Sequence, residues 1–530
     1  MYRYTVQWMG LCLVWFGLAT ASWSPPKNLS QLNLNAEAPQ VAIDEKGDAT
    51  AVWIEYNGDN WRVQSSTRRC GDWQKTPDTL SLPNLENDFP QIAVDSYGDA
   101  TAVWTGYNGS MWVIFASTKT HDGTWQTPPI SISLLPGISP QVAIDAAGNI
   151  TSIWTAYNGG NWTIQAATKP YGGEWQPAPD TLSLLSLDAE LPQMAIDPHG
   201  NCIAVWQLYD GSHWIIQSAV KPYGGTWQTI PDNVSRLSQD ATLAQIAVDK
   251  DGNATAVWLG YDGSNLVVLA STRPFGGAWQ AAPTILSQPR QDASNPQIVI
   301  DSEGNATAVW SRSNGENWIV QASTKPFGGA WQTNPDDVSA PGSSAESPQV
   351  GVDALDTVAV VWASSSGSGS VIQASKRRSG SNWRKTPKTI SKSGQGGVPQ
   401  IAVSPNGTAT VVWKNVFDNG VAIQSSTCFL DPPPPTRFTG SVQLKNNPTL
   451  KTKWNKSADN KVVKYQIFSR NRLIKTISSK NHLRASIRLS PRHYHGHLSN
   501  DYRQYIQNKY KIRSVDSHGT VGPWTMVEIE

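Results

Sequence analysis

Residues 39–53 read PQVAIDEKGDATAVW, and this stretch decides the fold because related copies of it occur eight times along the chain. The copies begin at Pro39, Pro90, Pro140, Pro192, Ala244, Pro296, Pro348 and Pro399. They follow one another at intervals of 50 to 52 residues. Repetition at a fixed period of this length is typical of identical structural units that stack on their neighbours. The sequence therefore predicts a repeat architecture.

Each repeat reads as four β-strands. The first is an alternating apolar segment that ends in Asp-x-x-Gly, which favours a tight turn with glycine in the left-handed position. The second strand, Ala49–Trp53 in the first copy, leads through a Tyr-Asn-Gly hairpin tip to a third strand. A Lys-Pro-Tyr/Phe-Gly-Gly loop then precedes a short fourth strand at Trp-Gln, as at Trp175-Gln176. No helical period is present, so the unit is predicted to be a four-stranded meander.

The two ends of the repeat region predict that it closes into a ring. The eighth copy stops at Cys428 without a fourth strand, and residues 23–30 (WSPPKNLS) match a fourth strand such as residues 125–131 (WQTPPIS). The fourth-strand tryptophans are then Trp23, Trp73, Trp125, Trp175, Trp227, Trp279, Trp331 and Trp383. An open array would gain nothing from this permutation, whereas a ring gains a joint that removes an exposed strand edge. We therefore predict an all-β, eight-bladed β-propeller over residues 22–429, closed by its N-terminal strand.

The N-terminal segment has the pattern of a secretory signal. Arg3 precedes an apolar stretch from Val6 to Leu18, and Ala19-Thr20-Ala21 ends residues 1–21 in the manner of an A-x-A cleavage site. The predicted location is therefore secreted, periplasmic or at the cell surface. The alternative is an uncleaved anchor, because Thr5 to Trp23 is close to the shortest length of a membrane-spanning helix.

Charge divides the chain into two parts of opposite sign. Residues 430–530 contain 18 Lys and Arg against 6 Asp and Glu, and residues 1–429 contain 24 against 35, so balances of +12 and −11 give the net charge of +1. A uniformly basic nucleic-acid binder is thereby excluded. The proline-rich residues 430–436 are predicted to be a stiff linker. The basic residues 437–530 could contact an anionic surface, although a solvated surface explains the same charges.

The repeats resemble those of β-propeller proteins, in particular secreted bacterial ones with Asp-x-x-Gly-Asn-Ala hairpins. The Trp-Asp pair of one large propeller family is missing, because Ile54 or Thr105 follows the tryptophan, and the spacing of sialidase-type Asp boxes is not matched. Residues 510–519 (YKIRSVDSHG) resemble the penultimate strand and turn of fibronectin type III domains, with Trp454 placed like their core tryptophan. This second resemblance implies a β-sandwich over residues 437–530, with an unusually long connection at 482–508.

Three cysteines remain after removal of the signal, so at least one does not pair within the chain. Cys202 lies in a strand-like run and is predicted to be a buried, inert thiol. Cys70 and Cys428 occupy similar places in the first and last repeats. They are candidates for a disulfide that latches the ring, provided that their Cα atoms are close enough.

The second hairpin of five repeats places an aromatic residue beside an amide or an acid. An aromatic ring next to fixed polar groups could stack on a sugar, and repetition around a ring would add avidity. The candidate ligand-binding residues are Tyr56, Asn57, Tyr107, Asn108, Tyr157, Asn158, Tyr209, Asp210, Tyr261 and Asp262. The competing interpretation is purely structural, and we favour it, because Asn/Asp-Gly is what the turn requires and tyrosine can cover the end of the hairpin.

Neither a metal site nor a cofactor is predicted. Asp249 and Asp251 lie in a segment that resembles part of a calcium loop, but the sister loops lack the donor pattern, which favours a solvated turn. His493, His495 and His497 would share one face of an extended segment, yet no acidic or cysteine partner accompanies them by spacing. The sequence contains no phosphate loop, nucleophile elbow or metal-binding cysteine motif.

The sequence favours a secreted or cell-surface, non-catalytic binding protein whose ligand is a carbohydrate or a protein surface. No catalytic residue, nucleic-acid partner or membrane span beyond the signal is predicted. One alternative is an extracellular hydrolase or lyase acting on glycans, which would need one deep, asymmetric pocket with unmatched carboxylates. Another is a structural surface protein. Shallow, equivalent clefts around the ring would favour binding over catalysis.

Overall fold

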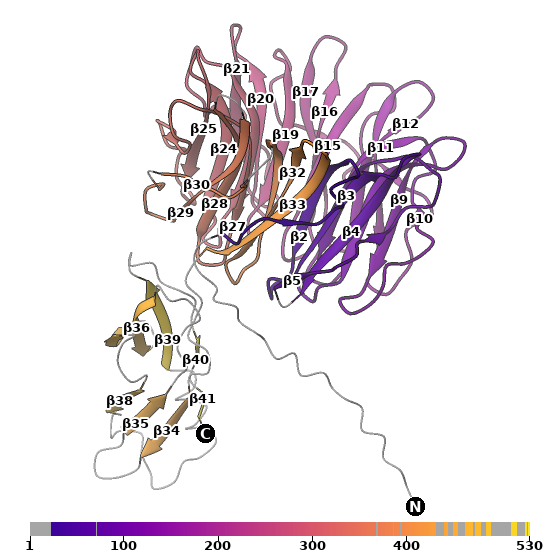
Figure 1. Ribbon diagram of the computed structural model, residues 1–530. Helices are drawn as coiled ribbons and strands as arrows, with labels where there is room; N and C mark the ends of the chain where they lie inside the picture. The colour runs from indigo at the N-terminus through magenta and orange to yellow at the C-terminus, as the bar shows by residue number, and fades with distance from the viewer. Residues whose placement is uncertain are drawn as a thin grey trace, which may run out of the picture. The chain divides into compact units, whose positions relative to one another are not determined.

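The computed structural model describes residues 23–69, 71–366, 369–384, 386–392 and 395–430, and beyond these the strands between residues 439 and 529. Residues 24–68 and 73–430 form one compact unit, built of eight sheets that follow one another around a ring (Figure 1). The first strands of successive sheets contact each other and so lie at the centre of the ring. The described residues contain no helix that could span a membrane. The predicted all-β, eight-bladed propeller is confirmed.

The strands of each blade run from the innermost to the outermost in chain order. Blades 1 to 4 consist of β2 (Ala36–Ile43), β3 (Ala49–Tyr56), β4 (Trp61–Arg69) and β6 (Asp78–Thr79), with an added β5 (Asp72–Trp73); β7 (Asn87–Val94), β8 (Ala100–Tyr107), β9 (Trp112–Lys119) and β10 (Ile130–Ser131); β11 (Gly137–Ile144), β12 (Ile150–Tyr157), β13 (Trp162–Lys169) and β14 (Asp180–Thr181); and β15 (Ala189–Ile196), β16 (Cys202–Tyr209), β17 (Trp214–Lys221) and β18 (Asp232–Asn233).

Blades 5 to 8 follow the same plan. They consist of β19 (Ala241–Val248), β20 (Ala254–Tyr261), β21 (Leu266–Arg273) and β22 (Thr284–Ile285); β23 (Ala293–Ile300), β24 (Ala306–Ser313), β25 (Trp318–Lys325) and β26 (Asp336–Asp337); β27 (Ser344–Val352), β28 (Thr357–Ser366), β29 (Gly369–Arg378) and β30 (Lys388–Thr389); and β31 (Gln395–Val403), β32 (Thr408–Phe417), β33 (Gly420–Phe429) and β1 (Lys27–Asn28).

The N-terminal strand completes blade 8, as the permuted repeat predicts. Strand β1 pairs antiparallel with β33, with Lys27 opposite Ser425 and Asn28 opposite Gln424. The Ile423 backbone N–H donates to Ser30 Oγ at 2.8 Å, and Leu29 N–H donates to Ile423 O at 2.7 Å. The inner strand β2 of blade 1 contacts both β7 and β31. The ring is therefore closed by hydrogen bonds between segments almost 400 residues apart in sequence.

The core lies between the blades and is built around one tryptophan in each. These eight side chains end the apolar part of the second strand and are at most 1% exposed: Trp53, Trp104, Trp154, Trp206, Trp258, Trp310, Trp362 and Trp413. Trp104, for example, packs in one cluster with Val52, Ile54 and Val63 of blade 1. Full burial of one large apolar side chain stabilises a fold by about 1.5–3 kcal/mol. The repeated tryptophan is therefore the packing element that holds each blade to its neighbour.

The inner strand of every blade contains a β-bulge, which lies at a proline in seven blades and at Ala244 in blade 5. In blade 1 the register shifts between Glu37 and Gln40, so that Ala38 and Pro39 together lie opposite one residue of β3. The residue just before this position has a positive φ in each blade, for example 48° at Ala38 and 50° at Phe89. Proline has no N–H for the strand ladder, and the extra residue of a bulge accommodates it. The bulge also bends the start of each inner strand.

The fourth strand differs from the prediction. The Trp-Gln pair was expected to form it, but in blades 2 to 8 the assigned strand begins a few residues after the tryptophan, for example at Ile130 rather than at Trp125. The Trp-Gln segment still makes one ladder bond, from Gln126 N–H to Thr118 O at 2.8 Å. Pro128 and Pro129 follow, and because proline cannot donate, the pairing resumes only beyond them.

The C-terminal segment contains two four-stranded sheets of its own. One has the order β38 (Arg484–Arg488), β35 (Thr449–Lys453), β34 (Thr439–Gln443) and β41 (Glu528–Ile529), with β34 and β41 parallel. The other has the order β37 (Arg472–Ser478), β36 (Val462–Ser469), β39 (Tyr510–Asp516) and β40 (Thr525–Met526), all antiparallel. The strands predicted at residues 450–454, 463–468 and from 510 onward coincide with β35, β36 and β39.

Candidate functional site

The hairpins give the propeller two faces with different chemistry. We call the face that carries the hairpins between second and third strands, such as residues 57–60, the tip face. The opposite ends of the second strands carry the Asp-x-x-Gly turns, such as residues 44–47, and we call that side the turn face. The loops that follow the third strands, such as residues 170–173, also lie on the turn face.

On the tip face, the predicted amides and acids are occupied by their own turns. Asn57 Oδ1 accepts hydrogen bonds from the backbone N–H groups of Asp59 and Asn60 at 3.0 and 2.9 Å. Asp210 Oδ1 accepts from Ser212 and His213 in the same way. The N–H groups of His213 and Ser212 hold the pKa of the Asp210 carboxyl below its usual range. These geometries support the structural interpretation of the tip residues.

The tip tyrosines are partly engaged as well, by a tryptophan that the sequence analysis did not identify. Ring centroids lie 5.2–5.8 Å apart in the four pairs Tyr56–Trp61, Tyr107–Trp112, Tyr157–Trp162 and Tyr209–Trp214. The two residues of each pair lie opposite each other on the two strands of one hairpin, so each pair is formed within its own blade. In blade 5, Tyr261 and Asp262 instead line a cleft of about 200 Å³ together with Arg236. Ligand binding by the tips stays a prediction.

On the turn face, each repeated aspartate organises its own turn. Asp249 Oδ1 accepts from the N–H groups of Asp251 and Asn253, both at 2.9 Å, and Asp249 Oδ2 accepts from Asn253 Nδ2 at 2.8 Å. Gly252 follows with a φ of +83°, which glycine adopts without strain. Both oxygens of this carboxylate accept hydrogen bonds from the turn, as expected for a solvated loop rather than a calcium loop.

Three clefts recur at equivalent positions between neighbouring blades on the turn face. They measure about 420 Å³ between blades 2 and 3, about 480 Å³ between blades 4 and 5, and about 340 Å³ between blades 6 and 7. The shared lining is a turn aspartate, the glutamine after the outer tryptophan, the basic residue at the end of a third strand and a loop glycine. These are Asp95, Gln126, Lys169 and Gly172; Asp197, Gln228, Arg273 and Gly276; and Asp301, Gln332, Arg377 and Gly380.

Aromatic side chains stand on the loops of four successive blades and edge two of these clefts. The exposed fractions are 67% for Tyr171, 59% for Tyr223, 61% for Phe275 and 58% for Phe327. Tyr171 and Phe275 belong to the linings of the clefts between blades 2 and 3 and between blades 4 and 5. We call the four residues the lip aromatics.

Each lip aromatic is held in place by the turn of its own blade. The Tyr171 N–H donates to Asn149 Oδ1 at 3.1 Å, and the equivalent bond from Phe275 N–H to Asn253 Oδ1 measures 3.0 Å. The ring lies directly over a turn glycine, because a Cβ placed on Gly148 would come within 2.6 Å of Tyr171 Cδ2. The lip aromatics are thus exposed and yet fixed. The repeated Lys-Pro-Tyr/Phe-Gly-Gly motif is the sequence signal for them, although the motif by itself predicts only a loop.

A separate set of carboxylates lies at the start of the inner strands, next to the bulges. Burial raises the pKa of the Asp88 carboxyl, and the nearby charge of Glu37 raises it further. Burial raises the pKa of Glu190 as well, with a smaller contribution from Asp188. Glu37 also accepts a hydrogen bond from Lys414 Nζ of blade 8 at 2.6 Å. Such acids occur in four of the eight blades, whereas a turn aspartate occurs in seven of them.

The remaining predicted residues divide into those that the structure describes and those that it does not. Cys202 is buried and unpaired, and burial raises the pKa of its thiol to about 12, in agreement with an inert core cysteine. Cys428 is buried at the end of β33. Its predicted partner Cys70 lies outside the described residues, and so do residues 1–21 and the three histidines at 493–497. The latch disulfide, the signal and the histidine cluster stay predictions.

Comparison with known proteins gives only distant structural likeness. No protein-family model matches the chain, and no curated protein matches it. Among solved structures, the chain is similar to an ulvan lyase of polysaccharide lyase family 25, with 14% identity over 62% of this chain and 92% of that one and a TM-score of 0.42. It is similar to the polysaccharide lyase Uly1, with 9% identity, 62% and 88% of the chains covered and a TM-score of 0.43.

A fungal alcohol oxidase of the AA5 family, in complex with copper, resembles the chain at 12% identity, with 96% and 99% of the two chains covered and a TM-score of 0.43. Likeness at these values does not transfer an activity from those proteins to this one. By its own strand pairing, the chain is an eight-bladed β-propeller closed by its N-terminal strand.

Proposed function

We propose that the chain is a secreted or cell-surface, non-catalytic protein that binds carbohydrate at several equivalent clefts on the turn face of its propeller. The observation that carries this proposal is the recurrence of one lining, with a basic residue, a glutamine and a loop glycine, between three pairs of blades. Repeated equivalent sites raise the affinity for a repeating polymer through avidity.

The chemistry of the clefts suits a sugar. Volumes of about 340–480 Å³ are at the small end of ligand pockets, the size for one or a few sugar rings. A fixed aromatic ring such as Tyr171 or Phe275 offers a flat apolar surface for the C–H face of a pyranose. The Arg273 guanidinium can donate two parallel hydrogen bonds to a carboxylate or sulfate on that sugar. We therefore propose acidic polysaccharides as the preferred ligands.

The C-terminal segment is proposed to be a fibronectin type III-like β-sandwich joined to the propeller by the stiff proline-rich linker. The strand orders β38-β35-β34-β41 and β37-β36-β39-β40 support this assignment, because a β-sandwich consists of two small sheets of mainly antiparallel strands. Its positive balance of +12 over residues 430–530 would reinforce binding to an acidic polymer.

A glycan array probed with the full chain tests the proposal. Replacement of Tyr171, Tyr223, Phe275 and Phe327 by alanine together should weaken binding at least ~100-fold, because avidity multiplies the loss at each site. Replacement of Tyr107, Tyr157 and Tyr209 by alanine is the matched control on the tip face and should change binding less than ~3-fold. Unchanged melting temperatures of both variants would exclude unfolding as the cause of weaker binding. Loss of binding in the tip variant alone would refute the assignment to the turn face.

A second candidate function is cleavage of glycans at the inner-strand carboxylates. It is favoured by one observation, the raised pKa of Asp88 beside Glu37 and its ion-paired Lys414, because a perturbed carboxyl next to a like charge is typical of acid–base sites. Incubation of the chain with a panel of acidic polysaccharides distinguishes the two functions. Chain shortening that Asp88→Asn abolishes would establish catalysis, and intact polymers with retained binding would exclude it.

A further inference from the structure

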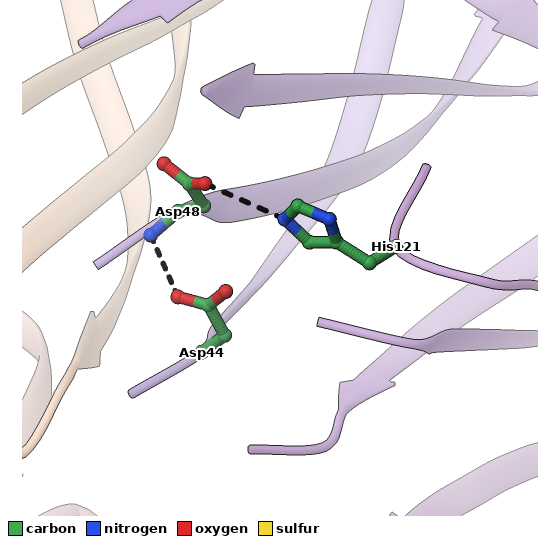
Figure 2. A group of neighbouring side chains, drawn as sticks. All are labelled: Asp44, Asp48 and His121. Atoms are coloured by element: carbon green, nitrogen blue, oxygen red, sulfur yellow. Dashed lines mark hydrogen bonds and ion pairs between the residues drawn. The ribbon is translucent and has the colours of Figure 1, made fainter. Parts of the chain in front are cut away.

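Blades 1 and 2 meet on the turn face at a cluster that occurs nowhere else among the described residues. Asp44 and Asp48 lie in the turn between β2 and β3, and His121 lies in the loop after β9. His121 Nε2 is 3.6 Å from Asp48 Oδ2, and one ligand atom from each of the three residues lies within 4.8 Å of the others. Figure 2 shows the imidazole pointing from blade 2 toward the two carboxylates.

The cluster arises from two departures from the repeat. In blades 3 to 6 the residue four positions after the turn aspartate is an asparagine, whose Nδ2 donates to the aspartate Oδ2 at 2.7–2.9 Å. In blade 1 this residue is Asp48, whose side chain has no N–H to donate. In the loop, the position of His121 is occupied by the lip aromatics in blades 3 to 6. A carboxylate and an imidazole have thus replaced an amide and an aromatic ring.

These replacements leave buried acceptor atoms that face one another. Asp44 is 1% exposed; its Oδ1 accepts from the N–H groups of Lys46 and Asp48, but its Oδ2 has no hydrogen-bond partner. His121 Nε2 is also buried without a hydrogen-bond partner. His121 Nδ1 lies 3.1 Å from Asp122 Oδ1. With a proton on Nδ1, held by Asp122, the lone pair of Nε2 is directed at the carboxylates, and a bound cation would satisfy all of these acceptors together.

We propose that Asp44, Asp48 and His121 bind a divalent first-row transition-metal ion, with Zn²⁺ as the representative, and that this ion joins blade 1 to blade 2. Ligands at about 2.0–2.2 Å from tetrahedral Zn²⁺ lie about 3.3–3.6 Å apart, which agrees with the 3.6 Å between His121 Nε2 and Asp48 Oδ2. The imidazole selects such an ion over Mg²⁺ and Ca²⁺, which prefer oxygen alone. Asp122 acts as the positioning residue that orients the imidazole.

Calorimetric titration of the full chain with Zn²⁺ tests this proposal. The histidine cluster at 493–497 is a competing site, so the titration uses the variant H493A/H495A/H497A as its background. The expected result is one Zn²⁺ per chain and a melting temperature raised by about 3–6 °C at a free Zn²⁺ concentration about 100 times Kd. Absence of Zn²⁺ binding in this background would overturn the proposal, and so would equal binding of Ca²⁺ or Mg²⁺.

Two variants restore the residues of the sister blades and are therefore expected to fold. Asp48→Asn supplies the missing N–H to Asp44, and His121→Tyr supplies a lip aromatic over Gly98. Each should abolish the Zn²⁺-dependent shift without lowering the melting temperature of the metal-free protein. Asp99→Asn changes the equivalent acid of blade 2, which accepts a bond from the His121 N–H, and should keep the shift. A shift that survives both Asp48→Asn and His121→Tyr would show that zinc binds elsewhere.

Discussion

The two faces of the propeller are built from the same repeat and yet present different chemistry. On the tip face, Asn57 and its equivalents accept hydrogen bonds from turn N–H groups, and four of the five tyrosines pack against a tryptophan of their own hairpin. On the turn face, the aspartates and asparagines hold the loops so that lip aromatics, glutamines and basic residues surround the clefts between blades. Repetition alone therefore does not mark a binding site; what matters is which repeated atoms remain accessible after the turns are satisfied.

Deletion of residues 23–30 should have the largest effect, because it acts on both faces at once. The deletion removes β1, exposes the edge of β33 and takes away the buried Leu29. Loss of one buried leucine and several hydrogen bonds is expected to lower the free energy of unfolding by about 4 kcal/mol or more. Thermal unfolding measures the effect. A truncated chain with an unchanged melting temperature would contradict closure of the ring by the N-terminal strand.

Neutralisation of the cleft cations should show whether binding takes place on the turn face. Lys169→Gln and Arg273→Gln together remove one positive charge from each of two clefts on the turn face. Binding of an acidic polysaccharide should weaken ~10-fold or more at low ionic strength, and the remaining binding should depend less on salt. Surface plasmon resonance at two salt concentrations measures both quantities. Binding that keeps its affinity and its salt dependence would exclude these cations from recognition.

Removal of the tip caps should have the smallest effect. Asn108→Ala and Asn158→Ala each remove an Oδ1 that accepts two backbone N–H groups on the tip face. Each is expected to lower the free energy of unfolding by roughly 0.5–1 kcal/mol, because the hairpin loses a cap but no core contact. Chemical denaturation measures the loss, and the glycan array should be unaffected. Weaker glycan binding in these variants would show that the tip residues take part in binding.

The architecture could be predicted because it depends on features that can be read directly along the chain. The period, the Asp-x-x-Gly turn and the permuted strand at residues 23–30 are all visible in the sequence, and the structure confirms each of them. The place of the fourth strand was wrong, because prolines interrupt the ladder just after the predicted Trp-Gln pair.

The candidate sites could not be predicted in the same way, because they form between repeats. Gln228 and Arg273 line one cleft from neighbouring blades, and Asp48 meets His121 over 73 residues of sequence. The signal that was available is a departure from the repeat: a histidine where four sister blades carry Tyr or Phe. Its meaning depends on the facing turn of blade 1, which only the structure brings into contact with it.

A crystal structure of the full chain soaked with the acidic oligosaccharide that binds best on the array tests the central claim most directly. The account predicts sugar in the turn-face clefts between blades 2 and 3 and between blades 4 and 5, stacked on Tyr171 and Phe275 and paired with Lys169 and Arg273. Sugar bound only at the tip tyrosines, or only beside Glu37 and Asp88, would contradict it.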